Sequence, residues 1–115
     1  MKRVLIGMVS MFALTVFAGT AAAQDAKVAK GEKVFADQKC SLCHSIAGKG
    51  NAKGPLDEVG TKYKAEELHQ WIVDPAAMAT KMKADRKPAM PAKYASLPKD
   101  DVDALVAYLS TLKKK

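Results

Sequence analysis

The chain has 115 residues, of which 49% are hydrophobic and 27% are charged, and its formal net charge at neutral pH is +7. This length supports one domain at most. The hydrophobic content excludes a wholly disordered chain, and the charged content excludes a membrane protein with several spans. The basic residues are too dispersed, and too few aromatic residues lie among them, for a nucleic-acid-binding protein.

The first residues have the character of a secretory signal peptide. A basic pair, Lys2 and Arg3, precedes an uncharged run that continues to Gln24 and contains the A-x-A pattern of a signal peptidase site. We expect residues 1–23 to be removed and residues 24–115 to form a periplasmic domain without a membrane span. Loss of the two basic residues would lower the formal charge from +7 to +5. An uncleaved anchor is the alternative, since about 20 uncharged residues can span a bilayer.

Apolar residues recur at helical spacing in three places, and alternating strand patterns are absent. The middle stripe is stopped by Asp74 and the proline after it, while Pro98 and three aspartates mark the start of the last stripe. The pattern therefore predicts three helices. Their stripes consist of Val28, Gly31, Val34 and Phe35, then Leu68, Trp71 and Ile72, then Val102, Leu105, Val106, Leu109 and Leu112.

Two stretches lack this periodicity. Residues 45–62 hold four glycines and Pro55, which predicts loops and turns. Residues 75–98 hold four prolines and three methionines. Here we expect one short helical turn at residues 76–83 and an extended backbone around Met90, because each proline restricts the residue before it.

Cys40, Cys43 and His44 form a C-x-x-C-H sequence, which is the attachment signal for c-type haem. Two cysteines three residues apart on a helical turn can form thioethers with both vinyl groups of one porphyrin, and the adjacent histidine can coordinate its iron. A thioredoxin-like redox pair would need a βαβ context, which the sequence does not provide. A zinc site would need a fourth ligand, for which His69 has poor spacing. The sequence therefore predicts one covalently bound haem c per chain.

Several motifs resemble those of small bacterial class I cytochromes c. They are Gly31–Phe35, Cys40–His44, Gly54-Pro55, Met90-Pro91 and Leu105–Leu109, and together they cover essentially all of the chain after residue 23. The resemblance implies an all-α, compact cytochrome c fold in which the N- and C-terminal helices cross and loops wrap one haem. Gly31 would permit the close approach of these helices, with Phe35 and Tyr108 packed beside it.

Further residues are expected around the haem. By the resemblance, the backbone carbonyl of Pro55 accepts a hydrogen bond from the ring of His44, which fixes the orientation of that ring and raises its basicity. Trp71 is expected in the core, where its indole N–H can also reach a haem propionate.

The sixth iron ligand is predicted to be Met90. This residue lies in a proline-flanked segment that can present a thioether at a fixed place, and the resemblance assigns the ligand to this position before the last helix. Met82 is the first alternative, and Met78 and His69 are the others. The two alternative methionines can instead fill gaps in the core, and His69 can be an ordinary exposed side chain.

His/Met ligation raises the reduction potential and fills both axial positions, so we expect electron transfer and no enzymatic activity. The predicted protein is a soluble, monomeric, periplasmic one-electron carrier. Its partners would be redox donors and acceptors with acidic docking surfaces, attracted by dispersed lysines that can equally form an ordinary solvated surface. The alternatives are a membrane-tethered electron-transfer subunit and a haem protein whose open sixth position serves ligand binding or peroxidase-like catalysis.

Overall fold

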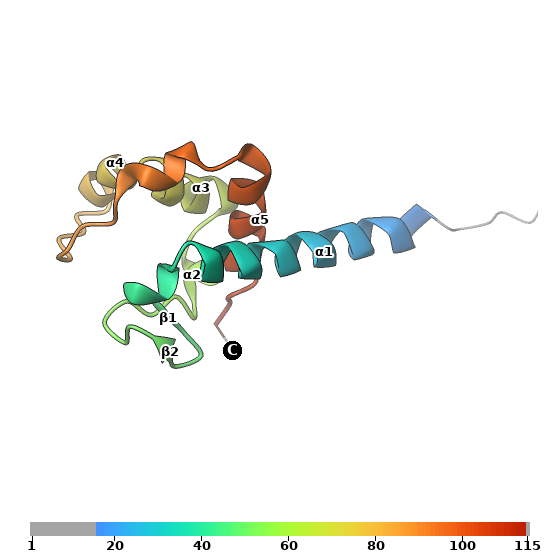
Figure 1. The fold of residues 1–115 in the computed structure, drawn as a ribbon, viewed down its shortest axis with the longest axis horizontal. Coiled ribbons are helices and arrows are strands. Elements are labelled where there is room, and N and C mark those ends of the chain that lie inside the picture. Colours follow the sequence, from blue (N-terminus) through green and yellow to red (C-terminus); the bar gives the residue numbers. More distant parts are fainter. Residues whose placement is uncertain (1–15, 115) are drawn as a thin grey trace, which may run out of the picture.

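The computed structural model describes residues 16–114, with side chains from residue 22 onward. Helices dominate this part of the chain, which confirms the all-α prediction (Figure 1). The elements in chain order are α1 (Val16–Asp37), the 3-10 helix η1 (Cys40–Leu42), β1 (Ser45–Ile46), β2 (Lys49–Gly50), α2 (Val59–Lys62), α3 (Ala65–Val73), α4 (Pro75–Lys81), the 3-10 helix η2 (Ala92–Ser96) and α5 (Lys99–Ser110).

The predicted signal peptide lies largely outside the described residues, which exclude positions 1–15. Helix α1 begins at Val16 and runs without interruption through the expected cleavage point after Ala23. The N-terminal part of this helix projects beyond the other helices (Figure 1). Removal of residues 1–23 therefore stays a prediction.

Helices α1 and α5 cross at Gly31, as the resemblance implied (Figure 1). A β-carbon at Gly31 would collide with the carbonyl oxygen of Ala104 and lie 2.6 Å from Cβ of Tyr108. Phe35 and Tyr108 make an edge-to-face contact beside the crossing, with ring centroids 5.9 Å apart. An ion pair of 3.3 Å between Lys30 and Asp101 joins the same two helices. Glycine is therefore required where the two backbones meet.

The hydrophobic core lies between α1, α3, η2 and α5. Burial of each large aliphatic side chain there contributes about 1.5–3 kcal/mol. Each of the three predicted stripes supplies part of this core, which confirms the helical periodicity. The buried cluster consists of Val34, Leu68, Ile72, Tyr94, Val102, Leu105 and Leu109.

The ends of α3 and α4 follow local sequence signals. The backbone N–H of Lys64 donates to the carboxylate of Glu67, three residues on, at 3.0 Å. Asp74 ends α3 and caps α4 by accepting a hydrogen bond of 3.3 Å from the N–H of Ala77. Helix α4 ends at Lys81, and Lys83, two residues later, has a left-handed φ of 55°. The short helix expected at residues 76–83 is therefore confirmed, with its bounds at Pro75 and Lys81.

Four short elements were not predicted. β1 and β2 form an antiparallel hairpin around Ala47 and Gly48, whose φ values of 53° and 79° are those of a type I′ turn. Strands of two residues are too short to produce an alternating pattern. α2 lies inside the glycine-rich stretch, where it is held by a hydrogen bond from the N–H of Lys114 to the Thr61 hydroxyl. The 3-10 helix η2 replaces part of the expected extended segment. Pro91 restricts the backbone of the residue before it, but it does not prevent the residues after it from forming a helical turn.

Candidate functional site

The C-x-x-C-H sequence forms one tight turn directly after α1. Lys39 adopts a left-handed φ of 57°, which ends the helix and starts η1. The N–H groups of Cys43 and His44 then both donate to the carbonyl of Cys40, at 3.2 and 3.0 Å. Because residues three apart are eclipsed in a 3-10 turn, the two cysteines lie on the same side of it. Both are free thiols, as attachment to a porphyrin requires.

The ring of His44 is oriented by a backbone carbonyl. Its Nδ1 lies 3.1 Å from the carbonyl oxygen of Gly54. Because a carbonyl can only accept, Nδ1 carries the proton, and Nε2 is the nitrogen that can bind a metal. The hydrogen bond predicted for this ring is therefore present, but its acceptor is Gly54 and the assignment to Pro55 was wrong.

The neighbouring backbone explains why the acceptor is Gly54. Ser45 forms a bridge with Pro55, in which the Ser45 N–H donates to the Gly54 carbonyl at 3.0 Å and the Leu56 N–H donates to the Ser45 carbonyl at 2.8 Å. This bridge turns the Gly54 carbonyl toward residues 44 and 45, so that it accepts two hydrogen bonds.

Burial and nearby charge shift the pKa values of two residues of the turn. Burial lowers the pKa of His44, and the guanidinium of Arg86 lowers it further, while the hydrogen bond to Gly54 opposes them. The neutral ring is the form with a free lone pair for a metal. Burial also raises the pKa of Cys40 to about 11, so this side chain is held as a thiol.

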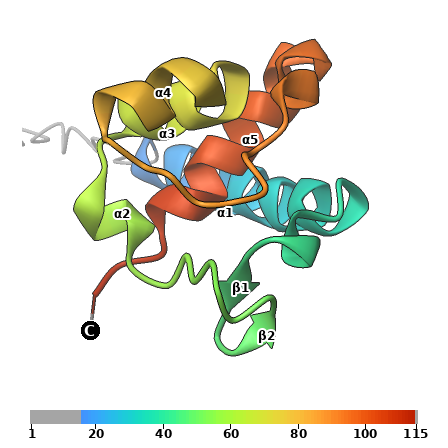
Figure 2. The same cartoon turned by 90° about the vertical axis from the view of Figure 1, so that its left-hand side faces the viewer.

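The segment between α4 and α5 passes in front of α5 and α1 on the side of the molecule that carries the C-x-x-C-H turn (Figure 2). At one end, Arg86 lies against Gly54, because a β-carbon on this glycine would overlap the guanidinium. At the other end, Tyr94 is buried, and besides this burial the proximity of both cysteines raises the pKa of its phenol. Met90 lies between these two ends and is half-buried against the core.

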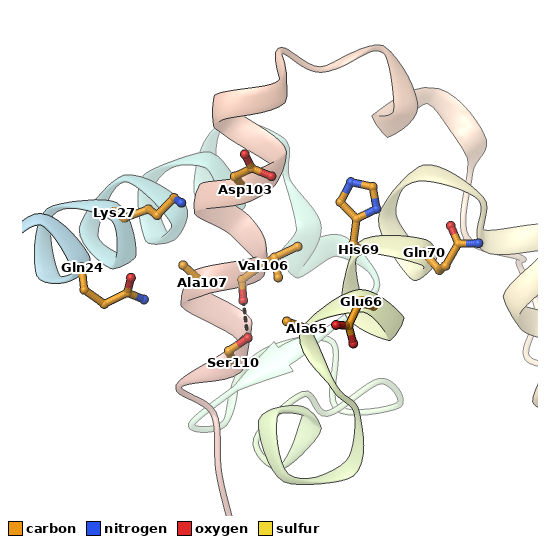
Figure 3. A pocket seen from close by; sticks show the side chains of 10 residues that line it. All are labelled: Gln24, Lys27, Ala65, Glu66, His69, Gln70, Asp103, Val106, Ala107 and Ser110. Atoms are coloured by element: carbon orange, nitrogen blue, oxygen red, sulfur yellow. Dashed lines mark hydrogen bonds between the residues drawn. The ribbon is translucent and has the colours of Figure 1, made fainter. Parts of the chain in front are cut away.

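The other candidate ligands have different surroundings. Met78 is 2% exposed within α4, and Met82 caps the C-terminus of that helix. His69 is exposed and lines an open groove of about 690 Å³ between α1, α3 and α5 (Figure 3). In the described residues no three His, Cys, Asp or Glu side chains are grouped as a metal site would require.

Trp71 provides an independent test of whether a haem fits here. Its Nε1 is buried and has no hydrogen-bond partner among the described residues. A buried indole N–H normally finds an acceptor, because leaving it unpaired costs about 1–3 kcal/mol. The carboxylate of a bound haem would supply that acceptor. The orphaned N–H and the free thiols beside the oriented His44 therefore fit a haem.

Sequence reasoning missed two residues of this site. Gly54 was noted only as part of a motif, although the Gly-Pro pair marked the correct loop. Arg86 is one of many dispersed basic residues, and nothing local distinguishes it from its neighbours. Its position against Gly54 results from tertiary folding alone.

Comparisons with known proteins agree with this geometry. Residues 28–113 match the model of the family described as cytochrome c. The chain is also 34% identical over 93 residues to cytochrome c oxidase subunit 2 of Alkalihalophilus pseudofirmus, in an alignment that covers 73% of this chain and 25% of that protein. No solved structure matches the chain. The chain belongs to the cytochrome c family and has the features of its class I members, whose haem serves electron transfer.

Proposed function

We propose that this protein is a periplasmic one-electron carrier whose haem c is bound through Cys40 and Cys43 and ligated by His44 and Met90. One observation carries the proposal: the Nδ1 of His44 is held by the Gly54 carbonyl at 3.1 Å, beside two free thiols. Family membership supports the haem chemistry. Met90 lies between Arg86, which is packed against Gly54, and Tyr94, whose phenol is influenced by both cysteines, and this position supports its role as sixth ligand.

A bound haem supplies the ferric–ferrous couple of its iron. The chain's own residues control the conditions around it. Cys40 and Cys43 retain the group covalently, and the Gly54 carbonyl fixes the His44 ring and raises its basicity. A thioether from Met90 would favour the ferrous state and would leave no iron position open to a substrate. The reaction is then electron transfer without bond chemistry.

A docking surface around the C-x-x-C-H turn is the second part of the proposal. Leu42 is 70% exposed within this turn and is a large hydrophobic side chain with no cover. Exposed lysines lie on both sides of it in the sequence and recur in residues 75–98, called here the methionine segment; they are Lys39, Lys49, Lys53, Lys81, Lys83, Lys87 and Lys93. An exposed apolar side chain together with exposed lysines suits a partner whose own docking surface combines acidic groups with an apolar contact.

A membrane-tethered electron-transfer subunit is the alternative that a specific observation favours. The matched relative is named as a subunit of cytochrome c oxidase, although the chain spans only about a quarter of its length. Within residues 16–114 no helix is long and apolar enough to cross a membrane.

Optical spectra and intact mass test the proposal together. The chain is expressed with its own N-terminus in a host that matures c-type cytochromes. We expect a mass that corresponds to residues 24–115 plus one haem, and a reduced spectrum that does not change when carbon monoxide is added. Carbon monoxide binding would show an open sixth position, a retained leader in the membrane fraction would support the tethered subunit, and a colourless product would refute the proposal.

A further inference from the structure

Arg86 has a position that no other basic residue of the methionine segment shares. Its guanidinium approaches Gly54 so closely that a β-carbon on this glycine would overlap Nη1 and lie 2.9 Å from Cζ. Gly54 is itself buried. The absence of a side chain at position 54 thus creates the space in which the Arg86 guanidinium lies.

This contact brings a positive charge next to the group that orients the axial histidine. The carbonyl of Gly54 accepts the hydrogen bond from Nδ1 of His44. Arg86 is half-buried, so water screens its charge less than that of the exposed Lys87 beside it. Among the described residues the ion pairs are Lys30–Asp101 and Lys99–Asp103, and neither compensates Arg86.

We infer that Arg86 sets the electron affinity of this cytochrome: its guanidinium, held against Gly54 on the His44 side of the site, stabilises the reduced form relative to the oxidised form. The inference rests on the proposed function, because it needs an iron bound to His44. Ferric iron carries one more positive charge than ferrous iron. A fixed cation nearby therefore disfavours the oxidised state more than the reduced state and raises the reduction potential.

The direction of the effect separates this role from a purely structural one. If Arg86 acted only by supporting the Gly54 carbonyl, its loss would weaken the hydrogen bond to His44 and make the ring a poorer donor to iron. That change would favour ferrous iron and raise the potential. Loss of the charge itself lowers the potential, so the two roles predict shifts of opposite sign.

Redox titration of the mature haem protein tests the inference with four proteins: wild type, Arg86→Gln, Arg86→Lys and Lys87→Gln. We expect Arg86→Gln to change the equilibrium between the two states about tenfold in favour of the oxidised form, a fall of 59 mV for a one-electron couple. Arg86→Lys keeps the charge and should change the equilibrium between the two states less than threefold. Lys87→Gln is the matched control, because it removes one exposed charge from the adjacent residue. It should also change the redox equilibrium less than threefold.

The inference is overturned by any of three results: the reduction potential of Arg86→Gln shifts no more than that of Lys87→Gln, the potential of Arg86→Gln rises, or the potential of Arg86→Lys falls as far as that of Arg86→Gln. Should Arg86→Gln not accumulate as a haem protein, Arg86→Met carries the same expectation while retaining an unbranched apolar stem. Wild-type protein without a reversible one-electron couple would refute the proposed function and this inference with it. A normal wild-type couple with unshifted Arg86 variants refutes the role of Arg86 alone.

Discussion

The Nδ1–H of His44 donates to the carbonyl of Gly54 across 3.1 Å, although ten residues separate the two in sequence. The same carbonyl accepts from the N–H of Ser45, so the histidine ring is fixed to a backbone that is itself held in place. A ligand whose second nitrogen is anchored in this way presents Nε2 in one direction. The rigid orientation suits an electron carrier, in which geometry should change little between oxidation states.

Replacement of Met90 tests the other side of the iron. In the mature protein, Met90→Ala should abolish the near-infrared absorption band expected from an iron–sulfur bond and lower the reduction potential, because a thioether favours ferrous iron. Met82→Ala is the matched control and should retain the band. Should Met90→Ala keep the band and Met82→Ala lose it, the ligand is Met82 at the end of α4.

Replacement of Trp71 has an effect whose sign depends on a bound carboxylate. If the buried Nε1 donates to a haem propionate, Trp71→Phe should lower the free energy of unfolding of the haem protein by about 1–3 kcal/mol, because the propionate loses a partner. Urea unfolding followed by haem absorbance measures this. Tyr63→Phe is the control, since it retains the ring that contacts Trp71 with a centroid distance of 6.2 Å. A stability equal to or above wild type would mean that the N–H has no acceptor.

The sequence predicted those features of the site that depend on neighbouring residues. The C-x-x-C-H turn, the stripes of α1, α3 and α5, and the stop at Asp74 are all local patterns, and the structure contains them. The predicted acceptor for the His44 ring, Pro55, is one residue away from the observed acceptor, Gly54. The direction of the Gly54 carbonyl depends on the bridge between Ser45 and Pro55, which the sequence does not reveal. Such long-range pairing leaves no periodicity in the chain.

Replacement of Gly31 tests the crossing of α1 and α5. Gly31→Val should lower the free energy of unfolding by about 1–3 kcal/mol, because its β-carbon would collide with the backbone of Ala104 and force the helices apart. Ala29→Val, on the exposed side of the same helix, is the matched control and should cost only a few tenths of a kcal/mol in helix propensity. Equal losses in the two variants, measured by urea unfolding, would contradict the close approach at Gly31.

The docking surface predicts that charge and apolar contact act on different rate constants. Electron transfer to an acidic redox partner should slow as ionic strength rises, since steering by surface charge is screened by salt. Lys39→Gln should reduce the association rate, whereas Leu42→Ala should mainly speed dissociation, because it removes the exposed apolar centre. Lys27→Gln is the charge-matched control, as Lys27 lines the groove beside α3 and α5 (Figure 3). Stopped-flow rates that are flat from low to high salt, or equally reduced by Lys27→Gln and Lys39→Gln, would exclude a docking role for the lysines around the C-x-x-C-H turn.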